Sequence, residues 1–294
     1  MSMQYLRKCL LLFYQSQWLI AFAAAGLVYT APIAWGEHAI FSPLVGLVFF
    51  ATYLEYNLSR LVLFWSHFSV ITKKPKIKGS DLAFLFLYLL CFCATLFFLN
   101  AVSTSVRYVF LVSAGLTLLY SVSFTAGSLQ LKGLRRFGFI KLMLIGVVWS
   151  IVSILLPAMQ SGMDGMQLKI VVLCIQRCCF IIAITLPFDV RDALQDRIAG
   201  VNSLPIRWGN GMARRLSAVL LGVYVVLAFM HLFNGAFLLF ASDIVVAAAA
   251  AYLIFSPAFK RDSEWYYLYL DATLLLLSLC LFFANCVLRN VYIP

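Results

Sequence analysis

Nine stretches of the chain are almost continuously apolar, and polar residues gather in the segments between them. A helix needs about 20 mainly apolar residues to cross a bilayer, because each residue advances it about 1.5 Å through a hydrocarbon core of about 30 Å. The stretches have about that length, so each predicts a membrane-spanning helix. They run approximately Trp18–Trp35, Ile40–Tyr56, Leu82–Leu99, Tyr108–Phe124, Phe137–Met159, Ile170–Phe188, Leu216–Phe233, Ala236–Phe255 and Trp265–Leu288.

The continuity of these stretches favours helices over strands, since a membrane β-barrel would show segments of about ten residues that alternate in polarity. Composition agrees with a membrane protein. Of the 294 residues, 64% are hydrophobic and 11% are charged, against about 45–50% and about 25% in soluble proteins. We therefore predict an all-α integral membrane protein, a bundle of about nine transmembrane helices in a single multi-span domain over residues 1–294.

Lysine and arginine outnumber aspartate and glutamate by 22 to 11, and they fall mainly in alternate connections. With a cytoplasmic N-terminus, 18 basic residues lie inside and three, Arg107, Lys169 and Arg289, lie outside, while Arg177 falls within the sixth span. This asymmetry follows the positive-inside rule. It predicts a multi-pass protein, in our expectation of a bacterial inner (plasma) membrane, with a cytoplasmic N-terminus. Basic loops this short suit anionic membrane lipid and not nucleic acid.

Three of the eleven acidic residues, Asp189, Asp192 and Asp196, follow the sixth apolar stretch at spacings of three and four. On a helix these spacings place the carboxylates within an arc of about 60° on one face. Like charges so placed repel each other, so something must offset the repulsion. Either Arg191 and Arg197 or solvent neutralise the cluster, or the carboxylates bind a divalent cation such as magnesium, which prefers oxygen ligands and bridges carboxylates to phosphates.

The sequence after the triplet favours the cation. The stretch Phe188–Gly209 resembles the second aspartate-rich motif of UbiA-type intramembrane prenyltransferases, which continues from three aspartates to a Gly, a Ser or Thr with Leu-Pro-like residues, and a closing Gly. The matching residues here are Asp189, Asp192, Asp196, Gly200, Ser203, Leu204, Pro205 and Gly209. The resemblance implies a nine-span fold in which the three aspartates hold magnesium on the diphosphate of a prenyl donor.

The resemblance also covers the plan of the chain. Members of the family have active-site loops on the cytoplasmic side after the second and sixth spans, where this chain has its two longest connections, Ser66–Asp81 and Asp189–Arg215. The resemblance implies that a tyrosine and several basic residues near the fourth and fifth spans bind the diphosphate. Basic side chains suit this role because they stabilise phosphate charge. Positive-inside topology explains these basic residues almost as well. The corresponding residues are Tyr120, Lys132, Arg135, Arg136 and Lys141, and Arg191 joins them beside the triplet.

The first motif of the family departs from the expected pattern. It usually reads Asn-Asp-x-x-Asp at the end of the second span, but here Asn57 is followed by Leu58 and Leu61 where aspartates are expected, with Arg60 between them. Three consequences are open. The protein works with one metal while Asn57 and Arg60 contact phosphate, it binds a phosphorylated lipid without turnover, or it catalyses another reaction on the same scaffold.

Arg177 lies near the middle of the sixth span, about twelve residues and so about 18 Å before Asp189. A charge at that depth costs at least about 2.5–3.5 kcal/mol and therefore faces the bundle interior or a wet cavity. A functional role would be contact with a polar acceptor substrate. The structural alternatives are a buried pair with an acid such as Asp271 or a hydrogen bond to Gln176.

The resulting hypothesis is a membrane-embedded prenyltransferase. It would transfer an isoprenoid chain from a prenyl diphosphate to a lipophilic acceptor, aromatic compounds included, with magnesium as cofactor and membrane lipid as surroundings. The main alternative is a non-catalytic or catalytically impaired membrane protein that binds a prenyl or lipid diphosphate, and the altered first motif favours it. A transporter is a weaker alternative, because it would show paired interrupted spans in two related halves.

Overall fold

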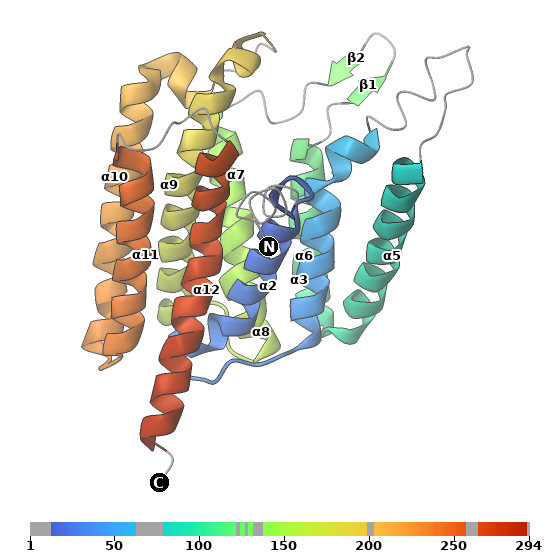
Figure 1. Ribbon diagram of the computed structural model, residues 1–294. Helices are drawn as coiled ribbons and strands as arrows, with labels where there is room; N and C mark the ends of the chain where they lie inside the picture. Colours follow the sequence, from blue (N-terminus) through green and yellow to red (C-terminus); the bar gives the residue numbers. More distant parts are fainter. Residues whose placement is uncertain are drawn as a thin grey trace, which may run out of the picture.

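The chain folds into a bundle of long helices (Figure 1). The computed structural model describes residues 13–62, 79–121, 124–126, 129–131, 138–198, 203–256 and 264–292. Its elements are α2 (Trp18–Thr30), the 3-10 helix η1 (Ala31–Trp35), α3 (Pro43–Tyr56), α5 (Gly79–Ala101), α6 (Thr104–Ser121), β1 (Phe124–Ala126), β2 (Leu129–Leu131), α7 (Gly138–Ser150), the π-helix η3 (Ile151–Leu155), α8 (Leu156–Gln160), α9 (Leu168–Ile198), α10 (Leu204–Phe233), α11 (Phe237–Phe255) and α12 (Glu264–Tyr292).

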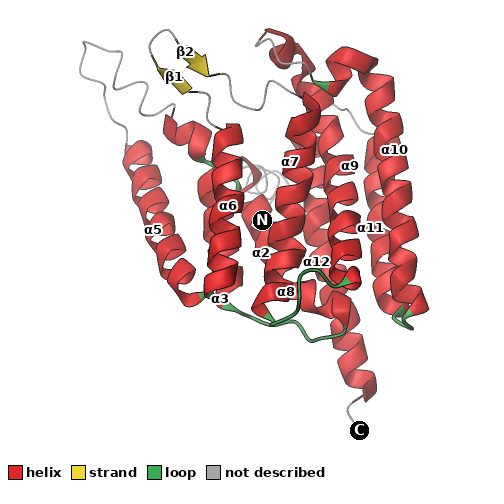
Figure 2. Ribbon diagram, turned by 180° about the vertical axis from the view of Figure 1, so that it is seen from behind, coloured by secondary structure: helices red, strands yellow, loops and turns green. Residues whose placement is uncertain are grey.

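The predicted all-α membrane fold is confirmed. Within the described ranges, seven helical segments are long and apolar enough to cross a membrane, and two shorter apolar helices, Pro43–Tyr56 and Thr104–Leu119, coincide with the second and fourth predicted spans. The number of nine spans stays a prediction. Consecutive long helices alternate in direction, so starts and ends of helices meet at both ends of the bundle (Figures 1 and 2).

Two predicted boundaries, the end of the sixth span and the start of the seventh, are wrong for the same reason. The connection expected over Asp189–Arg215 is mostly helical, because α9 continues to Ile198 and α10 begins at Leu204, twelve residues before the predicted start at Leu216. Hydropathy detects only the part of a helix that meets lipid, whereas backbone hydrogen bonding carries the helix beyond it as long as water or protein solvates the polar side chains. The three aspartates therefore lie on a helix, as their spacing predicted, and that helix is the continuation of α9.

A smaller correction concerns the fourth predicted span, Tyr108–Phe124. Helix α6 ends at Ser121, and Phe124 starts the strand β1, which pairs antiparallel with β2 in register Phe124 to Leu131. This pair of strands stands at the same end of the bundle as the last turns of α9 (Figure 1). The apolar run through Phe124 does not by itself distinguish the end of a helix from the start of a short strand.

Helix packing places α9 at the centre of one half of the bundle. It packs mainly against α10 and α7, while α12 packs against α2 and α11. Close approach of α7 and α9 depends on Gly146, since a Cβ there would lie 2.7 Å from Cγ1 of Ile182 and 2.8 Å from Sγ of Cys178. The end of the bundle at which α9 finishes, and α7, α10 and α12 begin, is called the aspartate end below.

Candidate active site

The last three turns of α9 carry the aspartate triplet into two different environments. Asp189 is fully buried and Asp196 is 3% exposed, whereas the side chain of Asp192 is 22% exposed. Pro187 lies inside this helix, which continues past it to Ile198. The spacing of three and four therefore gives one helical face, as predicted, and the surrounding helices bury two of its three carboxylates.

Asp189 forms a buried ion pair with Lys141, whose Nζ donates a hydrogen bond to Oδ1 of the carboxylate. Lys141 stands in the first turn of α7, one helix away in the bundle. A carboxylate without water is stable only when such a partner compensates its charge. The sequence assigned Lys141 to diphosphate, and the structure brings it to the first aspartate of the triplet.

Three buried polar atoms in this region have no hydrogen-bond partner among the described residues: Oδ2 of Asp189, Oδ2 of Asp196 and Oγ of Ser203. Ser203 caps the start of α10 by position, but its hydroxyl makes no capping hydrogen bond. Buried polar groups are nearly always satisfied in proteins. The three free oxygens are therefore the atoms at which the described site offers ligation or hydrogen bonding to something else.

Magnesium matches this set of donors. Among the described residues no three acidic, histidine or cysteine side chains form a group that could hold a metal ion by themselves. Magnesium, however, keeps several waters and is usually held by one or two carboxylates together with substrate phosphates. Asp189 and Asp196 lie two helical turns apart on α9, so each offers one unused carboxylate oxygen as a separate ligand, and water and phosphate would complete the coordination.

Arg191 binds Asp192, the remaining carboxylate of the triplet, and connects α9 with α12. Its Nε and Nη2 donate to Asp192 over 2.7 and 3.2 Å, which is a two-pronged pair. The same guanidinium lies 4.4 Å above the ring of Tyr267 and 5.2 Å from that of Phe188. Arg191 thus offsets the repulsion within the triplet, together with Lys141; Arg197, the other cation considered for that role, is exposed at the end of α9.

The hydroxyl of Tyr14, just before α2, also interacts with Arg191. Burial, and next to it the negative charge of Asp271, raises the pKa of Tyr14 well above its usual value. The phenol consequently stays protonated at neutral pH. The segment before α2 therefore contributes a neutral hydroxyl to the region beside the triplet.

The residues of the altered first motif have structural contacts. Asn57 is 3% exposed, and its Nδ2 donates to the carbonyl oxygens of Tyr53 at 3.0 Å and Ser16 at 3.4 Å. Arg60 is exposed, and its guanidinium lies 4.2 Å above the ring of Phe84 on α5. Asn57 thus fastens the end of α3 to the segment before α2.

Four sequence-predicted residues are not placed by the structure. Tyr120 belongs to α6, but its side chain lies outside the description, as do Lys132, Arg135 and Arg136 altogether. Their roles in diphosphate binding stay predictions.

Arg177 lies in a second buried cluster, away from the triplet. Asp243 on α11 accepts hydrogen bonds from Nε2 of Gln176 at 2.9 Å and from the hydroxyl of Tyr224 at 2.6 Å, and it interacts electrostatically with Arg177. Nε2 of His231 is 3.7 Å from the same carboxylate. A buried acid beside Arg177 was one of the expected alternatives, and the structure has one, but it is Asp243 and not Asp271. Gln176 donates its hydrogen bond to the same Asp243.

Asp243 was not singled out from the sequence, and the charged neighbour of Asp271 was not identified from it. Both are acidic residues inside apolar stretches, which is the one signal that could have singled them out. Sequence spacing does not identify the partner of either aspartate, because the partners lie on other helices.

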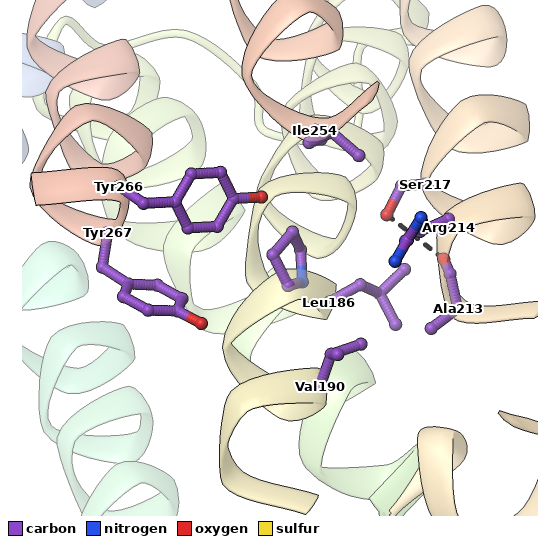
Figure 3. Close-up of a pocket in the computed structure, with 9 residues that line it drawn as sticks. Leu186, Val190, Ala213, Arg214, Ser217, Ile254, Tyr266 and Tyr267 are labelled. Carbon is purple, nitrogen blue, oxygen red and sulfur yellow. Dashed lines mark hydrogen bonds between the residues drawn. The ribbon is translucent and has the colours of Figure 1, made fainter. Parts of the chain in front are cut away.

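A cavity of about 30 Å³ lies between α9, α10, α11 and α12 near the triplet, lined among others by Leu186, Ser217, Tyr266 and Tyr267 (Figure 3). Both tyrosine rings project from α12 towards α9, and the hydroxyl of Ser217 donates to the carbonyl oxygen of Ala213. The volume is about that of one water molecule. A long apolar ligand would have to part these helices or use another part of the bundle.

Comparison with known proteins gives two matches. The family model described as the UbiA prenyltransferase family matches residues 79–277. No curated protein matches the chain by sequence. A solved structure reported as "Structural and mechanistic insights into the biosynthesis of Digeranylgeranylglyceryl phosphate synthase in membranes" is similar in fold, with a TM-score of 0.57 over 96% of this chain and 99% of that one, at 15% sequence identity.

Proposed function

The chain belongs to the UbiA prenyltransferase family, and from this premise we propose that it transfers an isoprenoid chain from a prenyl diphosphate to a lipophilic acceptor within a membrane. The observation that carries the proposal is the pair of buried, unpartnered carboxylate oxygens on Asp189 and Asp196, inside the family-matched region. A prenyl diphosphate combines an anionic head, which needs such a metal-binding end, with an apolar tail that suits a bundle of apolar helices.

In this proposal Asp189, Asp192 and Asp196 hold magnesium, which when bound would neutralise charge on the diphosphate and on the departing pyrophosphate. Lys141 fixes the Asp189 carboxylate, and Arg191 fixes Asp192. The bond between the allylic carbon and the diphosphate oxygen breaks, and its electron pair leaves with pyrophosphate. The acceptor then forms a bond to that carbon and releases a proton, so no protein nucleophile is needed.

Further residues are proposed for the diphosphate on the family pattern: Asn57, Arg60, Tyr120, Lys132, Arg135 and Arg136. We also propose that the aspartate end faces the cytoplasm, as the distribution of basic residues predicts.

Purified protein in lipid nanodiscs tests the proposal directly. With magnesium and geranyl, farnesyl or geranylgeranyl diphosphate, and with phenolic and glycerolipid acceptors, we expect release of pyrophosphate and formation of a prenylated product. Both should stop on addition of a chelator. Tight magnesium-dependent binding of every donor without any release would instead support the alternative of a non-catalytic diphosphate-binding protein.

Substitution of Asp192, the most accessible aspartate of the triplet, gives a sharper test of the metal site. Asp192→Asn should abolish magnesium-dependent binding of farnesyl diphosphate, because a neutral amide is a poor magnesium ligand. Titration calorimetry with and without magnesium measures the effect. Glu37→Gln, an exposed acid outside the apolar core, is the matched control and should bind like the wild type. Unchanged binding by Asp192→Asn would sink the metal-site assignment.

A further inference from the structure

Helix α10 has an open groove on its outer surface, beside the point where it bends at Gly209. The groove has a volume of about 560 Å³, and it is lined by Trp208 before the bend and by Gly211, Met212 and Arg215 after it. Small-molecule sites have volumes of about 300–1,000 Å³, so the groove is large enough for a ligand. The proposed prenyl transfer does not use it.

Two glycines shape the groove. Gly209 has a φ of 81° and a ψ of 161°, a conformation that residues with a Cβ rarely adopt, and it interrupts the helix between Trp208 and Gly211. A Cβ added to Gly211 would meet nothing within 4 Å, so this glycine leaves the bottom of the groove empty. Trp208 is 56% exposed and Met212 is also exposed. No other described segment of the chain therefore covers the groove.

The length of α10 sets the level of the groove in the membrane. The helix has 30 residues, and at about 1.5 Å per residue it is about 45 Å long, whereas the hydrocarbon core is about 30 Å thick. Its three arginines, Arg207, Arg214 and Arg215, all lie near its start at the aspartate end (Figure 1). The arginine-bearing start is therefore the part that extends out of the hydrocarbon. This places the groove among the lipid head groups, where tryptophan is enriched.

The charge of the groove suits a phosphate group. Arg215 forms no hydrogen bond and no ion pair with the other residues that the structure describes, and α10 contains no acidic residue that could compete for it. A guanidinium can bind two phosphate oxygens at once through its fixed pattern of N–H donors. Helical side chains also lean towards the start of their helix, so Arg215 leans from its own turn towards Gly211. An anionic ligand is favoured over a neutral one.

An apolar strip continues from the groove along the same face of α10. Val219 and Val226 follow Arg215 by four and eleven residues, which correspond to about one and three helical turns. Both valines are exposed, whereas other faces of α10 pack against α9 and α11. A ligand with an anionic head and an apolar chain therefore matches the groove and the strip together.

We propose that the groove at the bend of α10 binds one molecule of an anionic phospholipid. Its phosphate accepts hydrogen bonds from the guanidinium of Arg215 in the space left open by Gly211. Trp208 borders the head group, and an acyl chain follows Val219 and Val226. The bound lipid contacts α10 on both sides of Gly209. This inference does not depend on prenyl transfer.

Native mass spectrometry of the purified, delipidated protein tests the proposal. Dioleoyl phosphatidylglycerol is the anionic probe, and dioleoyl phosphatidylcholine is the zwitterionic one. The wild type should bind its first phosphatidylglycerol molecule at least tenfold more tightly than its first phosphatidylcholine molecule. Arg215→Gln removes the charge, and Gly211→Phe fills the groove from a position that nothing obstructs. Each should weaken the binding of phosphatidylglycerol at least fivefold.

Arg214→Gln is the matched control, because it removes the same charge from the adjacent residue. Arg214 does not line the groove but the small cavity between α9, α10, α11 and α12 (Figure 3). This variant should bind phosphatidylglycerol within twofold of the wild type. Equal losses in Arg214→Gln and Arg215→Gln would indicate a general attraction of anionic lipid and would overturn the inference. A wild type that binds both lipids equally would also overturn it.

Brominated phosphatidylglycerol locates the bound lipid, because bromine quenches a nearby tryptophan. It should quench the fluorescence of the wild type more than that of Trp208→Phe, and equal fractional quenching would overturn the inference. Thermal unfolding without lipid checks that each variant is folded. If Gly211→Phe fails to fold, Arg215→Gln decides the question, because Arg215 is exposed.

Farnesyl diphosphate without magnesium distinguishes a lipid site from a second position for a prenyl donor. An excess should leave the affinity for phosphatidylglycerol within twofold of its value without the donor. Displacement of one lipid molecule by one donor molecule would assign the groove to the donor and overturn the inference. Failure of the proposed prenyl transfer would appear separately, as absent release of pyrophosphate, which these lipid measurements do not use.

Discussion

At the scale of single residues, the aspartates of one helical face differ because of what stands opposite each. Asp189 meets Lys141 at a buried position, Asp192 meets Arg191 at a partly exposed position, and Asp196 is buried with one oxygen unpartnered in the described structure. Spacing predicted the shared face correctly, because it depends only on helical geometry. It could not predict the partners, since Lys141 lies 48 residues away on α7.

The Lys141–Asp189 pair makes a prediction about stability. Lys141→Met should destabilise the protein by about 3–5 kcal/mol, because it leaves a buried carboxylate without a compensating charge. The double variant Lys141→Met with Asp189→Leu should recover most of that loss, since no unpaired charge remains. Thermal unfolding in detergent measures both. A double variant no more stable than the single one would contradict this account of the pair.

At the scale of elements, two glycines near the site are required for different reasons. Gly146 in α7 faces α9 so closely that a Cβ would lie 2.7 Å from Ile182, although its backbone is ordinary helix. Gly209 in α10 has nothing within 4 Å of such a Cβ, but its φ of 81° and ψ of 161° form a kink that other residues rarely adopt. The family motif pointed to Gly209, whereas the crowding at Gly146 appears only when two helices are packed together.

The close contact at Gly146 predicts that a glycine-to-alanine substitution has different effects at Gly146 and at Gly222. Gly146→Ala should destabilise the protein by about 1–3 kcal/mol through overpacking against a stiff, β-branched isoleucine. It should also weaken magnesium-dependent farnesyl diphosphate binding by moving Lys141 from Asp189. Gly222→Ala, in an open position on α10, should be neutral or stabilising by about 0.5–1 kcal/mol. Thermal unfolding of the pair checks this, and equal stabilities would refute the packing argument.

At the scale of the whole molecule, the alternating direction of the helices places most of the described basic residues at one end of the bundle. The described basic residues at the aspartate end exceed those at the other, where Arg107 and Lys169 lie near the starts of α6 and α9. The residues at the aspartate end are Arg60, Lys141, Arg191, Arg197, Arg207, Arg214 and Arg215. By the positive-inside rule, this asymmetry predicts that the aspartate end faces the cytoplasm.

Labelling of introduced cysteines tests that orientation. In a background without the native cysteines, Glu37→Cys should react with a membrane-impermeant maleimide on intact bacterial cells, because it is exposed between η1 and α3 at the end opposite the triplet. Arg197→Cys, exposed at the end of α9, should react only after the cells are opened. The reverse pattern would show that the site faces outwards.

The sequence by itself determined the class of fold, the positions of the apolar helices and the helical face of the triplet. Each depends on local properties, namely hydropathy over about 20 residues and the helical repeat. Only the tertiary structure decided that α9 continues through the triplet, that Lys141 neutralises Asp189, and that Asp243 is the acid beside Arg177. Such pairings join residues on separate helices, and an isolated apolar stretch carries no information about which neighbour will pack against it.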